Sequence, residues 1–268
     1  MRFLIGLLVV LPLTGCFPAK PVQPTAAARV VAPTKIEATT PASSPRVTVT
    51  EISGIEFAGV AFDSRSHHLT VVDQPNGPGS RYPDSESAAR SLAGSAAVNA
   101  GFFTPEGAPL GLVVSSGKIS GAWNSASSLG SGVWYRDPAG VMAIVRREKL
   151  GRSRTSAMRE LIQAGPLLVE SGQAVGGLEP TKSSARSIIL WDGGSRWWIG
   201  CGSPCTLAAL GQALANSSPA GWPVHAALNL DGGRSSDLWI ADSVPGGPIL
   251  RRPPWNRPVR NFLVLVAR

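Results

Sequence analysis

Residues 229–236, with the sequence NLDGGRSS, place a carboxylate, an amide, a guanidinium and two hydroxyls at the end of an apolar strand that begins near residue 224. Such a density of polar groups on flexible backbone is typical of a functional site. A hairpin turn is the alternative, because Asp-Gly and Gly-Gly are ordinary turn dipeptides. A turn accounts for Asp231, Gly232 and Gly233 but not for Asn229 inside the strand. On this pattern alone, both alternatives stay open.

The elements that must position these groups are mostly short strands. Alternating apolar residues between turn signals predict strands at 47–50, 55–62, 68–72, 96–99, 112–114, 118–119, 132–136, 140–146, 166–170, 184–191, 196–200 and 262–266. Helices are predicted from Asp84 to about Gly94 and from Thr206 to Ala215. Because many strands and few helices do not alternate regularly, we expect a single α+β domain with a mixed, strand-rich sheet over 47–268.

The start of the chain predicts export and lipid anchoring. Met1-Arg2 precedes an apolar run over 3–13 that is too short to span a bilayer. The following Leu13-Thr14-Gly15-Cys16 resembles a bacterial lipobox, so we expect residues 1–16 to be a lipoprotein signal peptide and Cys16 to carry the lipid. An ordinary signal peptide is the alternative. Phe17, rather than Asp, after the cysteine favours the outer membrane.

Residues 17–46 are rich in Pro, Ala and Thr and predict a flexible tether, because they bury too little surface to offset their chain entropy. The net charge of +8 does not describe the domain that follows. Segment 1–46 contributes +4 and the arginine-rich tail 251–268 contributes +5, which leaves −1 for the middle. Because no nucleic-acid motif accompanies the charge, we expect no nucleic-acid partner.

Besides Cys16, the chain holds Cys201 and Cys205, which in an exported protein predict one disulfide. A metal site is the weaker alternative, since two thiols do not complete a tetrahedral zinc shell. The sequence contains neither a Gly-x-Ser-x-Gly elbow nor a His-Glu-x-x-His helix, so neither of those hydrolase signatures is present.

Several blocks along the chain together resemble the phosphodiester glycosidase family. They are Val98–Phe103, Pro109–Val114 with Gly117-Lys118, Gly165–Val169, Ser184–Ser187, Cys205–Leu207 and Asn229–Ser236. Their order and spacing agree with the family over about 47–268. Two departures are Ser187 in place of the usual threonine and Arg234 in place of the third glycine of the last block. Because a long cation at 234 would reshape the pocket, the substrate stays open.

The resemblance implies hydrolysis of the glycosidic bond of sugar-1-phosphodiesters. The leaving phosphomonoester is a weak base, so one carboxylate with cations for the phosphate would suffice. We expect Asp231 to be the nucleophile, the base or the group that stabilises an oxocarbenium ion. The other expected site residues are Asn99 and Asn229, which would orient the sugar or Asp231; Arg186 and Arg234, as phosphate clamps; Ser235 and Ser236, as phosphate donors; and Gly101, Gly232 and Gly233, in the substrate-binding loops.

Each assignment has a structural alternative. In these alternatives, Asn99 is a turn residue, Arg186 pairs with a structural acid, and Ser235 and Ser236 form hydrogen bonds with backbone groups. We expect no cofactor and no metal, with a divalent cation such as calcium on Asp231 as an open alternative.

Three functions remain. The first is an envelope-tethered glycosidase that acts on sugar-1-phosphodiesters in envelope or exopolysaccharide glycans. The second is a non-catalytic lipoprotein that binds phosphorylated glycans. The third is an envelope scaffold that is held at the membrane by its lipid anchor and docks its basic tail, 251–268, on anionic lipid. The intact Asn-Leu-Asp-Gly-Gly segment favours the first.

Overall fold

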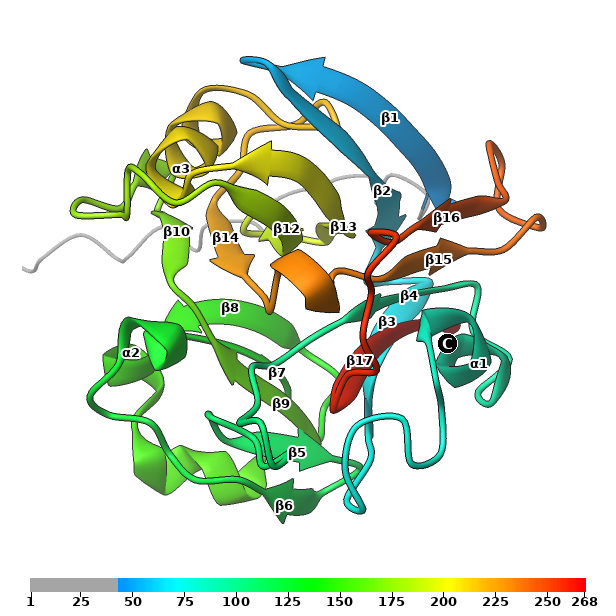
Figure 1. The fold of residues 1–268 in the computed structure, drawn as a ribbon, viewed down its shortest axis with the longest axis vertical. Coiled ribbons are helices and arrows are strands. Elements are labelled where there is room, and N and C mark those ends of the chain that lie inside the picture. The colour runs from blue at the N-terminus through cyan, green and yellow to red at the C-terminus, as the bar shows by residue number, and fades with distance from the viewer. Residues whose placement is uncertain (1–42) are drawn as a thin grey trace, which may run out of the picture. The chain divides into compact units, whose positions relative to one another are not determined.

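Short strands joined by tight turns make up most of the computed structural model, which describes residues 43–268 (Figure 1). The predicted signal peptide, 1–16, and nearly all of the predicted tether, 17–46, lie outside the described residues. Within the described part, the strands form three sheets. The expected strand-rich α+β domain with few helices is confirmed.

The seven-stranded sheet contains, in spatial order, β1 (Arg46–Ile52), β2 (Ile55–Asp63), β13 (Arg196–Cys205), β12 (Ser184–Trp191), β14 (Ala226–Asn229), β10 (Leu167–Glu170) and β11 (Gln173–Ala174). The second sheet contains β16 (Ile249–Arg251), β15 (Leu238–Ile240), β4 (Ala96–Asn99), β17 (Asn261–Ala267) and β3 (His67–Asp73). The third contains β6 (Lys118–Ser120), β5 (Val113–Ser115), β9 (Glu160–Ala164), β7 (Gly132–Arg136) and β8 (Met142–Arg146).

The strands form three sheets rather than one mixed sheet, and every strand pair of the described residues is antiparallel. The expected mixture of parallel and antiparallel strands is therefore wrong. Many neighbouring strands follow each other along the chain, such as β1 and β2 or β12 and β13. Tight turns between consecutive strands give antiparallel pairs, whereas parallel neighbours need crossovers of a dozen or more residues.

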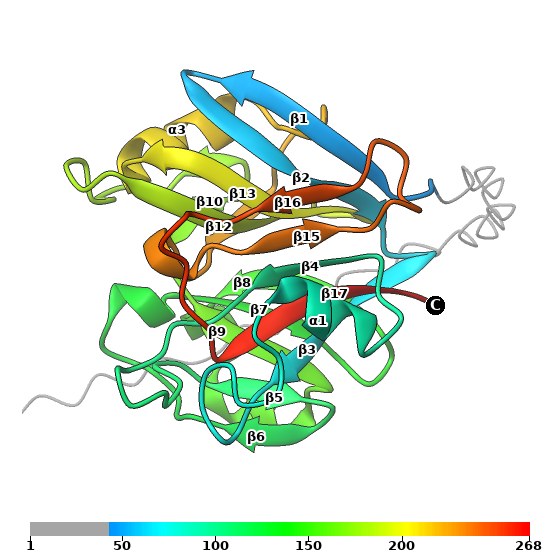
Figure 2. The ribbon, with the colours of Figure 1, turned by 45° about the vertical axis from the view of Figure 1, so that its right-hand side comes forward.

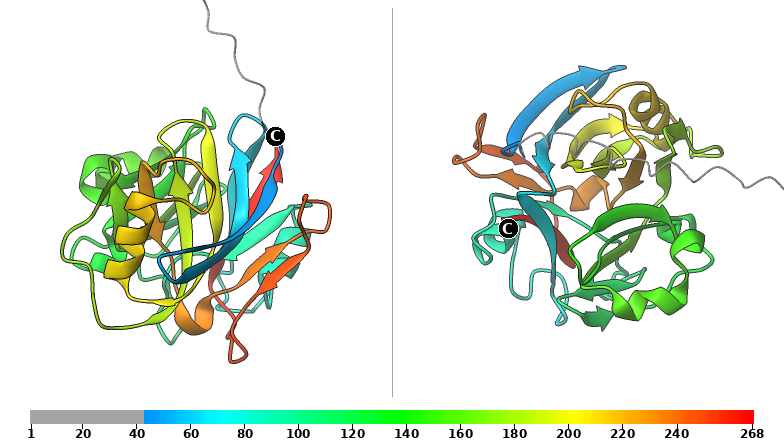
Figure 3. Two further views of the ribbon diagram at one scale, coloured as in Figure 1. Left: turned by 90° about the horizontal axis from the view of Figure 1, so that it is seen from above. Right: turned by 180° about the vertical axis from the view of Figure 1, so that it is seen from behind.

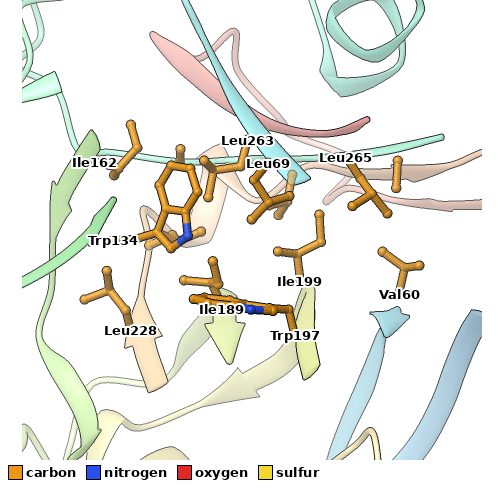
Figure 4. Packing of buried hydrophobic residues seen from close by; sticks show 14 of the residues in the cluster. Val60, Leu69, Trp134, Ile162, Ile189, Trp197, Ile199, Leu228, Leu263 and Leu265 are labelled. Carbon is orange, nitrogen blue, oxygen red and sulfur yellow. The ribbon is translucent and has the colours of Figure 1, made fainter. Parts of the chain in front are cut away.

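The main hydrophobic core lies where the inner faces of the three sheets meet. Figure 4 shows Trp134 of the third sheet close to Leu228 and Ile189 of the seven-stranded sheet, with Leu263 of the second sheet nearby. All four side chains are fully buried. Removing this apolar surface from water provides the main driving force that holds the sheets together.

Two helices cover outer faces of the sheets (Figure 3). Helix α3 (Leu207–Asn216) begins at Thr206, whose side chain accepts a hydrogen bond from the Ala209 N–H, and it packs Leu210 against the seven-stranded sheet. Helix α1 (Ser85–Arg90) begins with a capping box at Asp84 and packs against the second sheet. Both helix starts match the sequence prediction.

The remaining helical segments are α2 (Arg147–Leu150) and the 3₁₀ turns η1 (Ser128–Gly130), η2 (Arg152–Ala157) and η3 (Gly233–Ser235). In the part of the chain that the structure describes, no helix combines the length and the apolar composition needed to cross a bilayer.

The arginine-rich segment 251–268 is folded into the domain rather than forming a tail. Its last strand, β17, is an interior strand of the second sheet, between β4 and β3. Arg260 is buried and forms an ion pair with Asp73, and Arg252 pairs with Asp237 and Asp84. The charges of these two arginines are therefore paired inside the fold, which counts against a basic tail that docks on lipid.

Candidate active site

The Asp231 segment lies at the end of an interior strand. Strand β14 runs between β12 and β10 and ends at Asn229 near the centre of the molecule (Figure 1). The chain then turns through Gly232 and Gly233 into η3. A Cβ atom on Gly232 would lie 2.5 Å from the Ala185 carbonyl oxygen, and Gly233 has φ +60°. The two glycines are therefore required by close backbone packing and by a left-handed conformation.

The Asp231 carboxyl group is buried without full hydrogen bonding. The residue is 7% exposed, and its Oδ2 atom has no hydrogen-bond partner among the described residues. Burial raises the pKa of Asp231, while the Ser235 side chain, the charge of Arg257 and the Gly232 N–H act to lower it. An incompletely bonded buried carboxylate costs free energy, so it is the kind of group that a fold retains for chemistry.

Arg257 is the cation beside this carboxyl group. Its guanidinium lies 3.8 Å from Asp231 Oδ2, donates from Nε to Ser235 Oγ at 3.1 Å, and sits 4.7 Å from the centre of the Phe103 ring. Sequence reasoning missed Arg257 because it is distant along the chain and was grouped with the basic tail. No local pattern marked it.

The loop that carries Arg257 is fixed on the Asp231 segment. Asn256 donates from Nδ2 to the carbonyls of Arg234 and Ser236, and the Arg257 N–H donates to the Arg234 carbonyl. The backbone of η3 and the loop therefore hold each other in place, so that Arg257 stays over Asp231.

Asn99 lies at the end of β4 with its side chain buried. Its Nδ2 donates to the Asp231 carbonyl at 2.6 Å, and its Oδ1 accepts from the Ser187 hydroxyl at 2.6 Å and from the Asp237 N–H at 3.0 Å. All of these contacts are internal. Asn99 thus orients the backbone of Asp231. The residue belongs to a strand rather than a turn, and its side-chain hydrogen bonds are all made within the protein.

Two further amides near Asp231 have an unpartnered atom. Asn229 donates to the Gly165 carbonyl but leaves Oδ1 without a partner, and Asn261 accepts from the Gly101 N–H but leaves Nδ2 without one. Hydrogen bonds from Asp231 to Ala100 and from Ala100 to Asn261 join these backbone segments. Residues 43–268 contain six buried polar side-chain atoms without a partner. Three of them, in Asn229, Asp231 and Asn261, lie on adjoining segments, which is typical of a site that binds a polar ligand.

The other predicted site residues fall into two groups. Arg186 is buried and donates to the carbonyls of Cys205 and Lys182, so it pairs with no acid and ties β12 to the end of β13. Arg234 is exposed and donates to the Trp255 carbonyl. Ser235 and Ser236 are buried, and Ser235 contacts both Arg257 and Asp231. The structure thus brings Ser235, but neither predicted arginine clamp, to the carboxyl group.

A cavity of about 700 Å³ adjoins this segment. Gly233 and Ser236 form part of its wall, together with residues of β1, β2, β12, β13 and the loop 251–255. Cys201 also lines it, and burial raises the pKa of its thiol to about 12.

The predicted disulfide is wrong, because Cys201 and Cys205 are both free thiols. The two residues belong to one strand, β13. Residues four apart in a strand are separated by roughly 13 Å, beyond the reach of a disulfide. Within residues 43–268 there is also no cluster of three or more His, Cys, Asp or Glu side chains that would hold a metal ion.

Comparisons with known proteins agree with this description. A model of the phosphodiester glycosidase family matches residues 93–266. The catalytic domain of zebrafish N-acetylglucosamine-1-phosphodiester alpha-N-acetylglucosaminidase, auto-inhibited by its pro-peptide, superimposes with a TM-score of 0.58 at 18% identity, over 87% of this chain and 86% of that one.

Two bacterial structures are also similar. A hypothetical protein from Synechocystis gives a TM-score of 0.56 at 18% identity, over 83% of this chain and 61% of that one. A putative exported protein from Burkholderia pseudomallei gives 0.53 at 13% identity, over 80% and 74%. At these identities the likeness shows the fold. Comparison with curated protein sequences gave no significant match.

Proposed function

The chain belongs to the phosphodiester glycosidase family, and we propose that it hydrolyses the glycosidic bond of sugar-1-phosphodiesters in envelope or exopolysaccharide glycans. The family supports a glycosidase-type hydrolase. The identity of the substrate and the residue roles below belong to the proposal.

In the proposed reaction, water attacks the anomeric carbon, and the bond from that carbon to the bridging oxygen breaks. The products are a free sugar and a phosphomonoester. Because the phosphomonoester leaves as a weak base, the reaction depends less on a general acid than ordinary glycoside hydrolysis does. One carboxylate and one cation near the phosphate are then sufficient.

Asp231 and Arg257 fit these two roles. Asp231, in its ionised form, would accept the proton of the attacking water or stabilise positive charge on the sugar ring. Arg257 would donate to the phosphoryl oxygens, a geometry that suits a guanidinium. The observation that carries the proposal is the buried, unpartnered Oδ2 of Asp231 with the Arg257 guanidinium 3.8 Å away.

The two open amides complete the site. Asn229 Oδ1 would accept from a sugar hydroxyl, and Asn261 Nδ2 would donate to one, which satisfies groups that are otherwise buried without partners. Ser235 would fix the positions of the Arg257 and Asp231 side chains relative to each other, through its hydrogen bonds to both. Asn99, with all its contacts internal, would act as a positioning residue.

The test is release of free sugar from a panel of sugar-1-phosphodiesters, N-acetylglucosamine-1-phosphodiesters included, by the wild type, Asp231→Asn and Asp242→Asn. Asp242 is exposed and provides the matched control for loss of a carboxylate. We expect turnover by the wild type and by Asp242→Asn, and turnover at least about 10²-fold slower by a folded Asp231→Asn protein. Binding of these esters without turnover across the panel would instead support a non-catalytic glycan-binding protein.

We also propose that the protein is exported and anchored through Cys16. This proposal is supported by the Leu13-Thr14-Gly15-Cys16 sequence after the apolar run. In cell fractionation, the wild type should be found with the membranes, and Cys16→Ser should lose that association. Equal fractionation of the two proteins would contradict the proposal.

A further inference from the structure

The cavity of about 700 Å³ beside the Asp231 segment has a mostly apolar wall. It lies between the β1–β2 hairpin, β13 and the loop that follows β16, and Figure 2 shows β16 alongside β1 and β2. The apolar side chains include those of Val49, Phe57, Ala58, Pro253, Pro254 and Trp255. Val49 is 59% exposed and Trp255 is 64% exposed. Large apolar side chains left open around one concave site favour an apolar ligand.

The polar side chains of the wall suit a sugar poorly. The uncharged ones are short hydroxyls only, with no amide, and four charged side chains make up the rest of the polar wall. The hydroxyl of Ser203 already accepts a hydrogen bond from the Glu56 N–H. Hydroxyl-rich ligands need several donors and acceptors at fixed positions, since each buried hydroxyl without a partner loses its hydrogen bonds to water.

The cavity is continuous with the proposed catalytic segment. Gly233 and Ser236 line the cavity, and they follow Asp231 within the same turn. The Ser187 hydroxyl donates to Asn99, the residue that holds the Asp231 carbonyl, and lies 3.4 Å from the Ser236 hydroxyl. Asp231 and Arg257 themselves do not line the cavity, so Gly233 and Ser236 are the residues through which the cavity adjoins the proposed catalytic group.

The charges on the wall limit how many anionic groups the ligand carries. Arg251 lines the cavity, and its guanidinium has no ion pair or hydrogen bond among the described residues, whereas Arg252 is held by Asp237 and Asp84. Glu51 and Glu56, which are cross-strand neighbours, also line the cavity. We assign Arg251, together with Arg257 of the proposed site, to the single phosphate, and the two carboxylates of the wall repel a second anion.

We propose that this cavity binds the aglycone of the phosphodiester, and that this aglycone is an apolar alcohol, alkyl, prenyl or aryl, without a further anionic group. The inference rests on the proposed function, because it assigns the second substituent of the same phosphodiester. It excludes polyanionic and hydroxyl-rich aglycones as preferred substrates.

The first test measures binding without catalysis, by calorimetry on the purified protein with octyl phosphate and butyl phosphate. Because each buried methylene strengthens binding roughly fourfold, we expect octyl phosphate to bind at least about tenfold tighter than butyl phosphate. Equal affinities, or binding of neither compound, would overturn the inference.

Three variants locate the site. Val49→Asp should weaken octyl phosphate about tenfold or more. Val141→Asp, at an equally exposed valine that does not line the cavity, should bind like the wild type. Arg251→Gln should weaken both phosphates by the same factor, because it removes the contact to their shared group. Equal behaviour of Val49→Asp and Val141→Asp would overturn the inference.

The second test separates this inference from the proposed function. The wild type is given one sugar 1-phosphate esterified with octanol or with glycerol. We expect a higher kcat/KM for the octyl ester. Equal values would overturn the apolar aglycone but support the glycosidase. No release of sugar from either ester, with octyl phosphate still bound, would count against the glycosidase and leave the preference of the cavity established.

Discussion

Two buried carboxyl groups, Asp231 and Glu160, differ in how they are bonded. Burial raises the pKa of both. Glu160, in the middle of the third sheet, accepts from the N–H groups of Val71 and Ser116 through Oε2 and from Arg136 through Oε1. Asp231 instead leaves Oδ2 without a hydrogen bond and has its cation at 3.8 Å. A raised pKa alone therefore does not distinguish a functional acid from a structural one.

The difference lies in what each carboxylate is available to do. Glu160 joins β9 to β3 and to the β5–β6 turn, so its oxygens are committed to the fold. Asp231 is held through its backbone, by Asn99 and Ala100, and its Oδ2 atom remains without a hydrogen bond. Fixing the backbone while leaving the carboxylate unsatisfied is how a fold prepares a group for substrate.

The largest expected effect is on catalysis. Asp231→Asn should lower kcat by about 10²–10⁴, since that is the usual contribution of a positioned acid or base. It should also raise the stability of the fold at neutral pH. The folded-state pKa of Asp231 lies above its ordinary value of 3.8, so in the wild type stability is lost as pH rises between 3.8 and the folded pKa. Thermal unfolding from pH 3 to 8 should show this loss in the wild type and a smaller one in the variant. A lower melting temperature for Asp231→Asn at pH 7 would show that the carboxylate is structural.

Arg257→Gln should lower kcat/KM by about 10²–10³, the range seen when one electrostatic donor to a transition state is removed. It should also move the acid limb of the pH–rate profile to higher pH, because the positive charge of Arg257 lowers the pKa of Asp231. Arg234→Gln is the matched control, since that guanidinium is exposed and bonded only to a carbonyl in the described structure. If the acid limb of the pH–rate profile does not move in Arg257→Gln, the charge of Arg257 does not act on the carboxylate that controls this limb, which would contradict the assigned pairing with Asp231.

Glu160→Gln, unlike the variants of the candidate site, should lower the stability of the fold and leave catalysis unchanged. The new amide must point its NH₂ at either Arg136 or the two backbone N–H groups, so at least one donor loses its acceptor. We expect a loss of about 1–3 kcal/mol in the free energy of unfolding, with kcat unchanged for the folded enzyme. Denaturant titration and the sugar-release assay measure the two quantities. A large fall in kcat without destabilisation would assign Glu160 to the active site.

The smallest effect is expected from reduction. Because Cys201 and Cys205 are free thiols, a reducing agent should leave the melting temperature unchanged, and alkylation of the unfolded protein should modify both. Loss of a native disulfide typically costs 2–5 kcal/mol, so a bridge would be visible in the same experiment.

Much of the fold and the centre of the site could be predicted because their signals are local. Alternation and turn residues marked most strands, and Asp84 and Thr206 marked the starts of two helices. Strand β9 escaped because Glu160 and Gln163 interrupt its apolar pattern, although both side chains are buried and bonded. The partition into three antiparallel sheets depends on contacts between distant segments, which no local pattern encodes.

The candidate site likewise combines residues with a local sequence signal and residues that only tertiary contacts bring together. Asp231 could be proposed because the polar residues of its turn are contiguous in sequence, and the resemblance of the chain to its family is confirmed. Arg257 and Asn261 come from a separate segment and reach the site only through tertiary structure. Arg186 was proposed as a phosphate clamp because a guanidinium suits phosphate, whereas its side chain, on β12, donates to the carbonyls of Cys205 and Lys182.

The most direct test of the account is hydrolysis of a sugar-1-phosphodiester in oxygen-18-labelled water, with mass spectrometry of the phosphomonoester. The proposed function predicts an unlabelled phosphomonoester from the wild type, because water attacks the sugar carbon, and at least about 10²-fold less of it from Asp231→Asn in the same time. A labelled phosphomonoester would show attack at phosphorus, and would contradict a glycosidase built on Asp231.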